Sequence, residues 1–147
     1  MNKQVAIDDV IDLMIERLNA GGKVTFTPKG SSMLPMLRDG EDTVILEKPK
    51  GRLKLFDVAF YKRDNGQYVL HRVYSFESDG SYAMCGDNQF VLEHGIRNDQ
   101  IIAVMTAFFR KGKIYTTESV TYKIYINFWY YVRILRRILA FFARRLR

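Results

Sequence analysis

The sequence predicts a mainly β fold, a small coiled β-barrel or sandwich, with an amphipathic helix at each end. Residues 23–117 consist of short β-prone runs separated by turn residues. Residues 6–19 and 128–147 instead repeat apolar side chains at helical spacing. A length of 147 residues suits one domain with one modest core. We therefore divide the chain into three segments of a single domain, residues 1–22, 23–117 and 118–147.

The first segment is expected to form an N-terminal amphipathic helix. One face of this helix collects six apolar side chains: Ile7, Val10, Ile11, Met14, Ile15 and Leu18. Ala20-Gly21-Gly22 is typical of a helix end, because glycine adopts the left-handed conformation that closes a helix. Residues 1–18 also hold four acidic side chains and no apolar central run, so they are not expected to act as a secretory signal.

The central segment is expected to form the β domain. Its predicted strands cover residues 23–27, 42–47, 57–63, 67–74, 81–85, 100–109 and 113–117. Asp64-Asn65-Gly66 predicts a two-residue hairpin with a type I′ turn, because Asn-Gly suits positive φ angles. Asp79-Gly80 predicts a second turn. Glu93-His94-Gly95 is polar and is expected to be a loop.

The last segment is expected to form a basic amphipathic helix. Its apolar side holds Phe128, Val132, Leu135, Leu139, Phe142 and Leu146. The opposite side holds Arg133, Arg136, Arg137, Arg144 and Arg147, and Trp129, Tyr130 and Tyr131 lie near the start. Residues 119–147 carry a charge of +7, whereas the preceding 118 residues balance 16 basic with 16 acidic side chains. The excess charge of the protein is therefore confined to its tail.

This distribution predicts that the last helix lies on an anionic membrane surface. Packing on the protein's own core or on a partner is the alternative. Truncation after Ser119 is then expected to abolish vesicle binding and to preserve the chemistry of the β domain. No run of 18 apolar residues is present, so we expect peripheral association, by default on the cytoplasmic face, and no membrane span. A nucleic-acid partner is not expected, because the β domain carries no net charge.

The single cysteine, Cys85, excludes an internal disulfide. Cys85, His71 and His94 lack the paired spacing of a zinc site, so no metal or other cofactor is expected.

Ser32 and His71 are the candidate nucleophile and general base. Ser32 lies in a Gly-Ser-Ser segment followed by Pro35, where a tight turn can expose its hydroxyl. His71 lies on a predicted strand, and histidine ionises near neutral pH. With the ordinary pKa near 6.5, activity is expected to rise between about pH 6 and 7.5. Either Asp87 or Glu93 can supply the carboxylate that orients His71.

Three short boxes of the sequence stand out: Gly30-Ser31-Ser32-Met33-Leu34-Pro35, Leu70-His71-Arg72-Val73 and Gly86-Asp87-Asn88. Together they resemble the boxes of type I signal peptidases and the related LexA-type self-cleaving repressors. Most of that family has lysine at the position of His71, and histidine followed by arginine is similar to the endoplasmic-reticulum and archaeal branch. The resemblance covers roughly residues 23–109.

The resemblance implies a coiled β fold of the signal peptidase type and a serine endopeptidase that cuts signal-like or leader peptides after small residues. It places a second acidic residue at Glu93, six positions after Asp87. Gly30 stands where many bacterial members have a serine that stabilises the oxyanion. The oxyanion hole would therefore consist of backbone N–H groups at Gly30, Ser31 and Ser32.

Two alternatives remain at the level of the sequence. A LexA-type protein would cut itself at Ala20-Gly21, but this pair lies only 11 residues before Ser32 and no helix-turn-helix domain precedes it. A non-catalytic β domain carried on a membrane-surface helix would keep the three boxes as structural turns.

Overall fold

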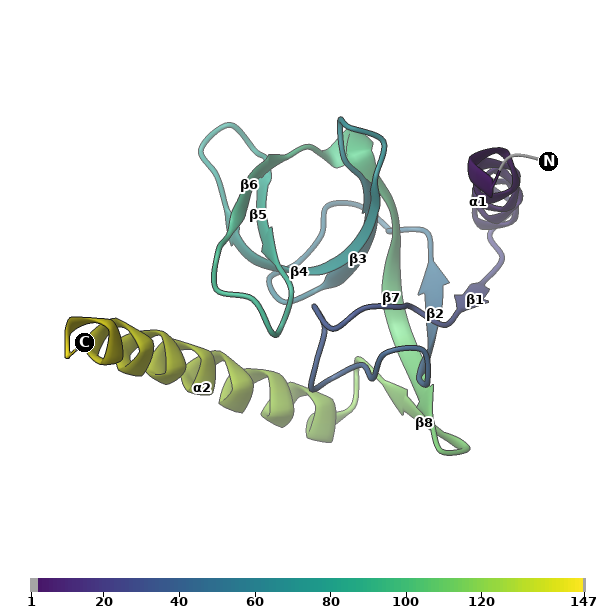
Figure 1. Cartoon of the computed structure of the whole chain (residues 1–147). Coiled ribbons are helices and arrows are strands. Elements are labelled where there is room, and N and C mark those ends of the chain that lie inside the picture. Colours follow the sequence, from purple (N-terminus) through teal and green to yellow (C-terminus); the bar gives the residue numbers. More distant parts are fainter. Residues whose placement is uncertain (1–2, 147) are drawn as a thin grey trace.

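The computed structural model describes residues 3–146, with side chains from residue 9 onward, and consists of one eight-stranded antiparallel sheet and two long helices (Figure 1). The elements in chain order are α1 (Lys3–Asn19), β1 (Val24–Phe26), β2 (Thr43–Glu47), β3 (Val58–Lys62), β4 (Tyr68–Phe76), β5 (Tyr82–Cys85), β6 (Glu93–Ile96), the 3-10 turn η1 (Asn98–Gln100), β7 (Ile101–Arg110), β8 (Lys113–Thr116) and α2 (Val120–Arg145). The predicted mainly β fold with a helix at each end is confirmed.

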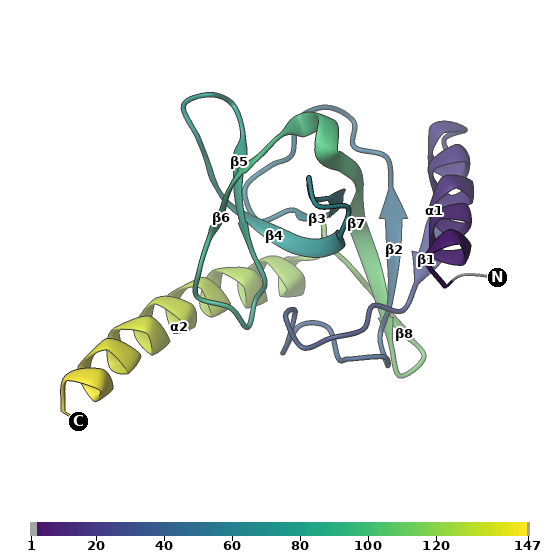
Figure 2. The same ribbon diagram turned by 45° about the horizontal axis from the view of Figure 1, so that its top comes forward.

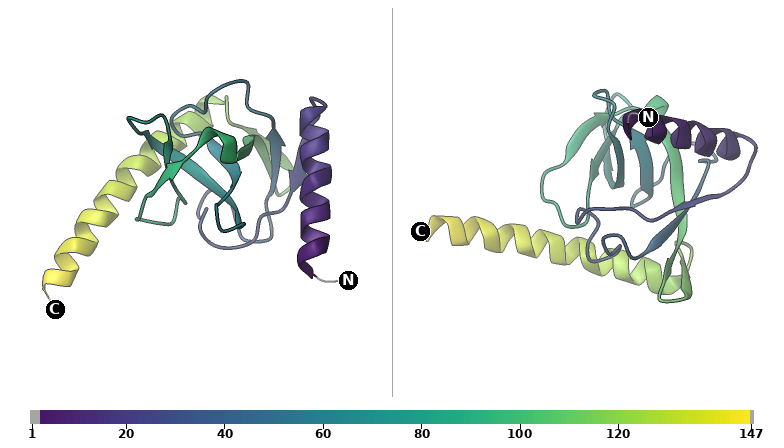
Figure 3. Two further views of the ribbon diagram at one scale, coloured as in Figure 1. Left: turned by 90° about the horizontal axis from the view of Figure 1, so that it is seen from above. Right: turned by 45° about the vertical axis from the view of Figure 1, so that its right-hand side comes forward.

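The strands pair in the order β1-β2-β7-β3-β4-β5-β6, and β8 adds to β7. The sheet curls strongly, so that β3 to β6 have an almost circular profile in Figure 1, and Figure 2 shows the same curl from a second direction. It is nevertheless open, because the edge strands β1 and β6 are not paired with each other. Figure 3 shows α1 beside the β1 edge and α2 on the other side of the molecule.

The segment Glu93-His94-Gly95 corrects one prediction. It forms strand β6, which pairs Glu93 with Met84 and Ile96 with Tyr82. The sequence pattern is misleading because β6 is a short edge strand, half exposed and containing a glycine at φ 75°. Glu93 is therefore held in the sheet rather than on a loop, which restricts where its carboxylate can reach.

The turn between β3 and β4 also differs from its prediction. Lys62 pairs with Tyr68, and the Arg63 N–H donates to the Gln67 carbonyl at 2.8 Å, which leaves a three-residue loop. Within this loop only Gly66 has a positive φ, of 89°, as in a type I turn closed by a left-handed glycine. The Asn65 side chain accepts a hydrogen bond from the Gln67 N–H at 3.0 Å, which favours this turn over type I′.

Both helices contribute to the main hydrophobic core. Ile11 and Leu18 of α1 are buried in it, as are Tyr122 and Ile126 of α2. The predicted apolar face of α1 is only partly correct, because Val10 is exposed. The Ile7 side chain, residues 1–2 and Arg147 lie outside the described part of the chain.

The position of α2 overturns two expectations. Arg133 and Arg136, predicted on the polar face of a membrane-surface helix, lie against the β body: the Arg133 guanidinium stacks on the Tyr74 ring at 4.1 Å, and that of Arg136 lies 5.2 Å from the Phe90 ring centroid. Truncation after Ser119 would remove core residues, so it is not a neutral cut. No helix among residues 3–146 has the length and apolar character needed to cross a membrane.

Candidate active site

Ser32 lies in the loop between β1 and β2, which rests on the turn after β5. The Ser32 carbonyl accepts a hydrogen bond from the Asn88 N–H at 2.9 Å, and the Ser31 carbonyl accepts one from the Asn88 side-chain amide at 3.3 Å. A Cβ atom at Gly86 would lie 2.4 Å from the Ser32 carbonyl oxygen. Glycine is therefore required at position 86, because the Ser32 backbone occupies the space of a side chain.

The strand register brings this contact to the level of His71. Arg72 of β4 pairs with Cys85 of β5 in an antiparallel ladder. His71 directly precedes Arg72 and Gly86 directly follows Cys85, so the two stand opposite each other at the end of the ladder. Since Ser32 packs on Gly86, the Ser32 loop and His71 lie at the same end of this ladder. Ser32 and His71 themselves form no hydrogen bond in the described part of the chain.

His71 is 4% exposed and faces a short relay of polar side chains. The Tyr61 hydroxyl donates to a Glu93 carboxylate oxygen at 3.0 Å and lies 3.4 Å from His71 Nδ1. A tyrosine hydroxyl has one proton, so its oxygen accepts from Nδ1–H while the proton goes to Glu93. This arrangement leaves Nε2 unprotonated, the form in which an imidazole acts as a base.

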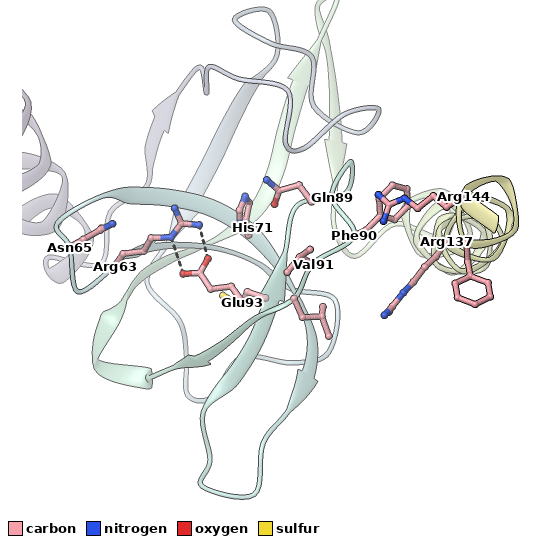
Figure 4. Close-up of a pocket in the computed structure, with 13 residues that line it drawn as sticks. Arg63, Asn65, His71, Gln89, Phe90, Val91, Glu93, Arg137 and Arg144 are labelled. Atoms are coloured by element: carbon pink, nitrogen blue, oxygen red, sulfur yellow. Dashed lines mark hydrogen bonds and ion pairs between the residues drawn. The ribbon is translucent and has the colours of Figure 1, made fainter. Parts of the chain in front are cut away.

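Glu93 itself is held by Arg63, which projects from the end of β3 (Figure 4). Arg63 Nε and Nη2 donate to the two carboxylate oxygens at 2.8 and 2.6 Å. These hydrogen bonds lower the pKa of Glu93. Glu93 is thus a fixed, ionised group that reaches His71 through Tyr61. Tyr61 and Arg63 were not singled out by the sequence, since a tyrosine and an arginine near a predicted turn are common.

Burial lowers the pKa of His71 to about 4, and the positive charge of Arg63 acts in the same direction. The imidazole is therefore neutral throughout the neutral pH range. The activity rise expected between pH 6 and 7.5 assumed that His71 has an ordinary pKa. With the lowered pKa, we expect the rise at lower pH.

Asp87 has a different partner. Its oxygens accept hydrogen bonds from Arg72 Nε at 2.7 Å and Nη2 at 2.8 Å, and the two side chains are 0% and 2% exposed. Arg72 also donates to the Phe56 carbonyl, the Tyr122 hydroxyl and the Met36 sulfur. Asp87 therefore makes no hydrogen bond to His71. It anchors an arginine that ties β4 to the Ser32 loop and to α2.

A second buried carboxylate fixes the other end of the Ser32 loop. Asp42 receives the Arg38 guanidinium at 2.6 Å and the Arg110 guanidinium at 2.8 Å. Although burial opposes ionisation, the hydrogen bonds from Arg38 and Arg110 hold the pKa of Asp42 well below its usual range. Arg110 also donates to the Met36 carbonyl. The loop is thus clamped to β7, and nothing in the local sequence indicates this long-range pair.

The candidate oxyanion donors are reduced from three to two. The Gly30 N–H already donates to the Asp39 carboxylate at 2.8 Å, which corrects the expectation that it faces an oxyanion. Within the described part of the chain, the N–H groups of Ser31 and Ser32 donate to no protein acceptor. These two groups are available to a developing negative charge.

Two cavities adjoin this arrangement. One, of about 310 Å³, is lined by Ser32 together with Phe26, Phe60 and Leu70. The other, of about 900 Å³, is lined by His71 and Glu93 and extends along residues 89–92 to α2 (Figure 4). Ser32 and His71 thus open onto different cavities, and a peptide that contacts both residues would extend into both.

Helix α2 supports the turn that carries Gly86. The Trp129 indole donates to the Asp87 carbonyl at 3.0 Å, and Arg133 donates to the carbonyls of Gln89 and Phe90 at 3.0 and 3.3 Å. The helix is therefore part of the scaffold of the site.

No protein-family model matches the sequence, and a search of curated proteins finds no significant match. Among the described residues, His, Cys, Asp and Glu side chains form no group of three that could hold a metal ion.

Proposed function

We propose that this protein is a serine endopeptidase of the signal peptidase type, with a coiled β fold of that type, in which Ser32 is the nucleophile and His71 the general base. One observation carries the proposal. The Ser32 loop packs on Gly86 at the level of a buried histidine whose Nδ1 faces a hydroxyl–carboxylate relay. A plain structural turn has no need of such a histidine.

In the proposed reaction, His71 Nε2 takes the proton of the Ser32 hydroxyl as the oxygen attacks the scissile carbonyl. The N–H groups of Ser31 and Ser32 stabilise the oxyanion. His71 then gives its proton to the leaving amine, and water hydrolyses the acyl-enzyme by the reverse sequence of proton transfers. Tyr61 and Glu93 hold the imidazole in its reactive tautomer.

The cavity beside Ser32 supports this substrate class. Its apolar walls include the aromatic rings of Phe26 and Phe60 and the side chain of Leu70, and Lys29 and Arg38 also line it. The apolar walls suit a small apolar residue before the scissile bond. Signal-like or leader peptides that end in small residues meet this requirement.

Cleavage of a quenched peptide library biased to small residues tests the proposal. Wild type is expected to turn over part of the library, and Ser32→Ala and His71→Ala are each expected to reduce kcat by at least about a thousandfold. Ser31→Ala is the matched control, because it alters the neighbouring hydroxyl and keeps both backbone donors. An inert wild type, or mutants as active as wild type, would favour the non-catalytic β domain. A shortened chain after prolonged incubation would favour self-cleavage.

We also propose that the protein binds an anionic membrane surface through α2. Most large apolar side chains of the face turned away from the β body are more than half exposed, as shown by Ile124, Phe128 and Tyr131. The same stripe continues to the end of the helix through Leu135, Leu139, Phe142 and Leu146. An apolar stripe of this length on a helix that carries arginines suits the lipid interface.

A further inference from the structure

The larger cavity contains two arginines that the proposed reaction does not use. Arg137 and Arg144, about two turns apart on α2, both line it. Arg133 and Arg136, which precede them on the helix, are taken up by contacts with the β body. Neither Arg137 nor Arg144 pairs with a carboxylate in the described part of the chain. Two positive charges therefore face a cavity rather than the protein.

The rest of the lining is mostly apolar. Phe90 and Leu92 border it from the segment before β6, and Phe141 borders it from α2. Figure 4 shows Arg137 extending from the helix toward the part of the cavity next to Val91. Glu93, the carboxylate among the lining residues of this cavity, is already paired with Arg63. The cavity is therefore apolar with a net positive charge at its outer end.

The chemistry of His71 indicates which part of a substrate would enter. His71 lines this cavity, whereas Ser32 lines the smaller one. The histidine must reach the leaving nitrogen to protonate it, so the cavity on its side takes residues that follow the scissile bond. The cavity beside Ser32 takes the residues that precede the bond.

We infer that the larger cavity is a subsite for the part of the peptide substrate after the scissile bond. Arg137 and Arg144 select acidic side chains there. This inference rests on the proposed peptidase function. Apolar residues of the peptide contact Phe90, Leu92 and Phe141, and the carboxylates meet the two guanidinium groups. The C-terminal helix then sets substrate specificity as well as supporting the site.

Binding and cleavage of a matched peptide series test this inference. The peptides share the residues before the cleavage site, which end in alanine, and differ afterwards in an Asp-Asp, Asn-Asn or Lys-Lys pair. Full-length Ser32→Ala protein in neutral detergent is expected to bind the Asp-Asp peptide roughly tenfold more tightly than the Lys-Lys peptide, from fluorescence anisotropy. Wild type is expected to show the same preference in kcat/KM.

Two double variants and one single control variant test whether Arg137 and Arg144 cause the preference for acidic peptides. Arg137→Gln/Arg144→Gln is expected to remove the preference, and Arg137→Glu/Arg144→Glu to reverse it. Arg145→Gln is the control, since Arg145 stacks over the Phe141 ring at 4.8 Å and does not line the cavity. All three sites are exposed, so the melting temperature is expected to stay unchanged.

The outcomes separate the inference from the function on which it rests. Cleavage of all three peptides with equal kcat/KM and equal affinity overturns the subsite and leaves the peptidase. An acidic preference in binding without any cleavage overturns the peptidase and leaves the cavity as a binding site for acidic peptides. Equal peptide affinity combined with loss of anionic-vesicle binding in the Arg137→Gln/Arg144→Gln variant assigns these arginines to lipid and overturns the inference.

Discussion

Gly86 shows how strongly one residue can constrain this site. Its missing side chain leaves the space that the Ser32 backbone fills, and a built Cβ would also lie 3.0 Å from Ser32 Cβ. The obstacle is main chain rather than the tip of a flexible side chain. Any larger residue must therefore move the loop that carries the candidate nucleophile.

Gly86→Ala is expected to lower kcat/KM by at least about a hundredfold, because displacement of a reacting group by about 1 Å has that effect. Gly80→Ala is the matched control: it lies at the other end of β5, has a φ of 85°, and meets only the Arg52 side chain. It should cost about 1 kcal/mol of stability through backbone strain and leave activity intact. Equal activity in the two variants would contradict the assigned position of Ser32.

The pKa of His71 predicts the acid side of the pH profile. A base with a pKa of about 4 is unprotonated from about pH 5 upward, so kcat/KM should rise around pH 4 and stay level to neutrality. The profile is measured between pH 3.5 and 8, with thermal unfolding followed at each pH to separate titration from acid unfolding. A midpoint near 6.5 would show that His71 is exposed in solution.

At the scale of elements, α2 has two faces with separate tasks. The inner face places Tyr122 and Ile126 in the core and bonds the turn at Asp87 through Trp129. The outer face touches nothing in the described protein over most of its length. The sequence predicted the apolar outer stripe largely correctly. Packing of the helix on the protein's own core was only the alternative expectation, because the aromatic and carbonyl partners of the arginines cannot be identified from local sequence.

Replacing the outer stripe separates the two tasks. Phe128→Ser/Leu135→Ser/Phe142→Ser is expected to weaken binding to anionic vesicles by roughly a hundredfold, because about half of each side chain leaves the interface. Peptide cleavage in detergent should be retained. Leu13→Ser, an equally exposed apolar site on α1, is the control. Unchanged vesicle sedimentation of the triple variant would refute a lipid-binding role for α2.

At the scale of the whole molecule, the sheet gathers distant segments around one corner. The Ser32 loop, the end of β4, the turn after β5 and strand β6 meet there, and α2 closes the corner from outside. Salt bridges bind the parts together: Arg72 with Asp87, Arg63 with Glu93, and Arg110 with Asp42. Each joins residues far apart in the chain, so the candidate site depends on the complete fold.

The sequence alone determined the fold class, the two helices, seven of the strands and the segments that carry the candidate nucleophile and base. It could do so because these features depend on local alternation, helical spacing and turn residues. Only the tertiary structure decided that Glu93 lies on a strand and reaches His71 through Tyr61, that Asp87 instead binds Arg72, and that the Gly30 N–H is occupied. It also decided that burial lowers the pKa of His71. These properties depend on which distant side chains become neighbours and on how far folding removes water from them. Local spacing in the sequence predicts neither.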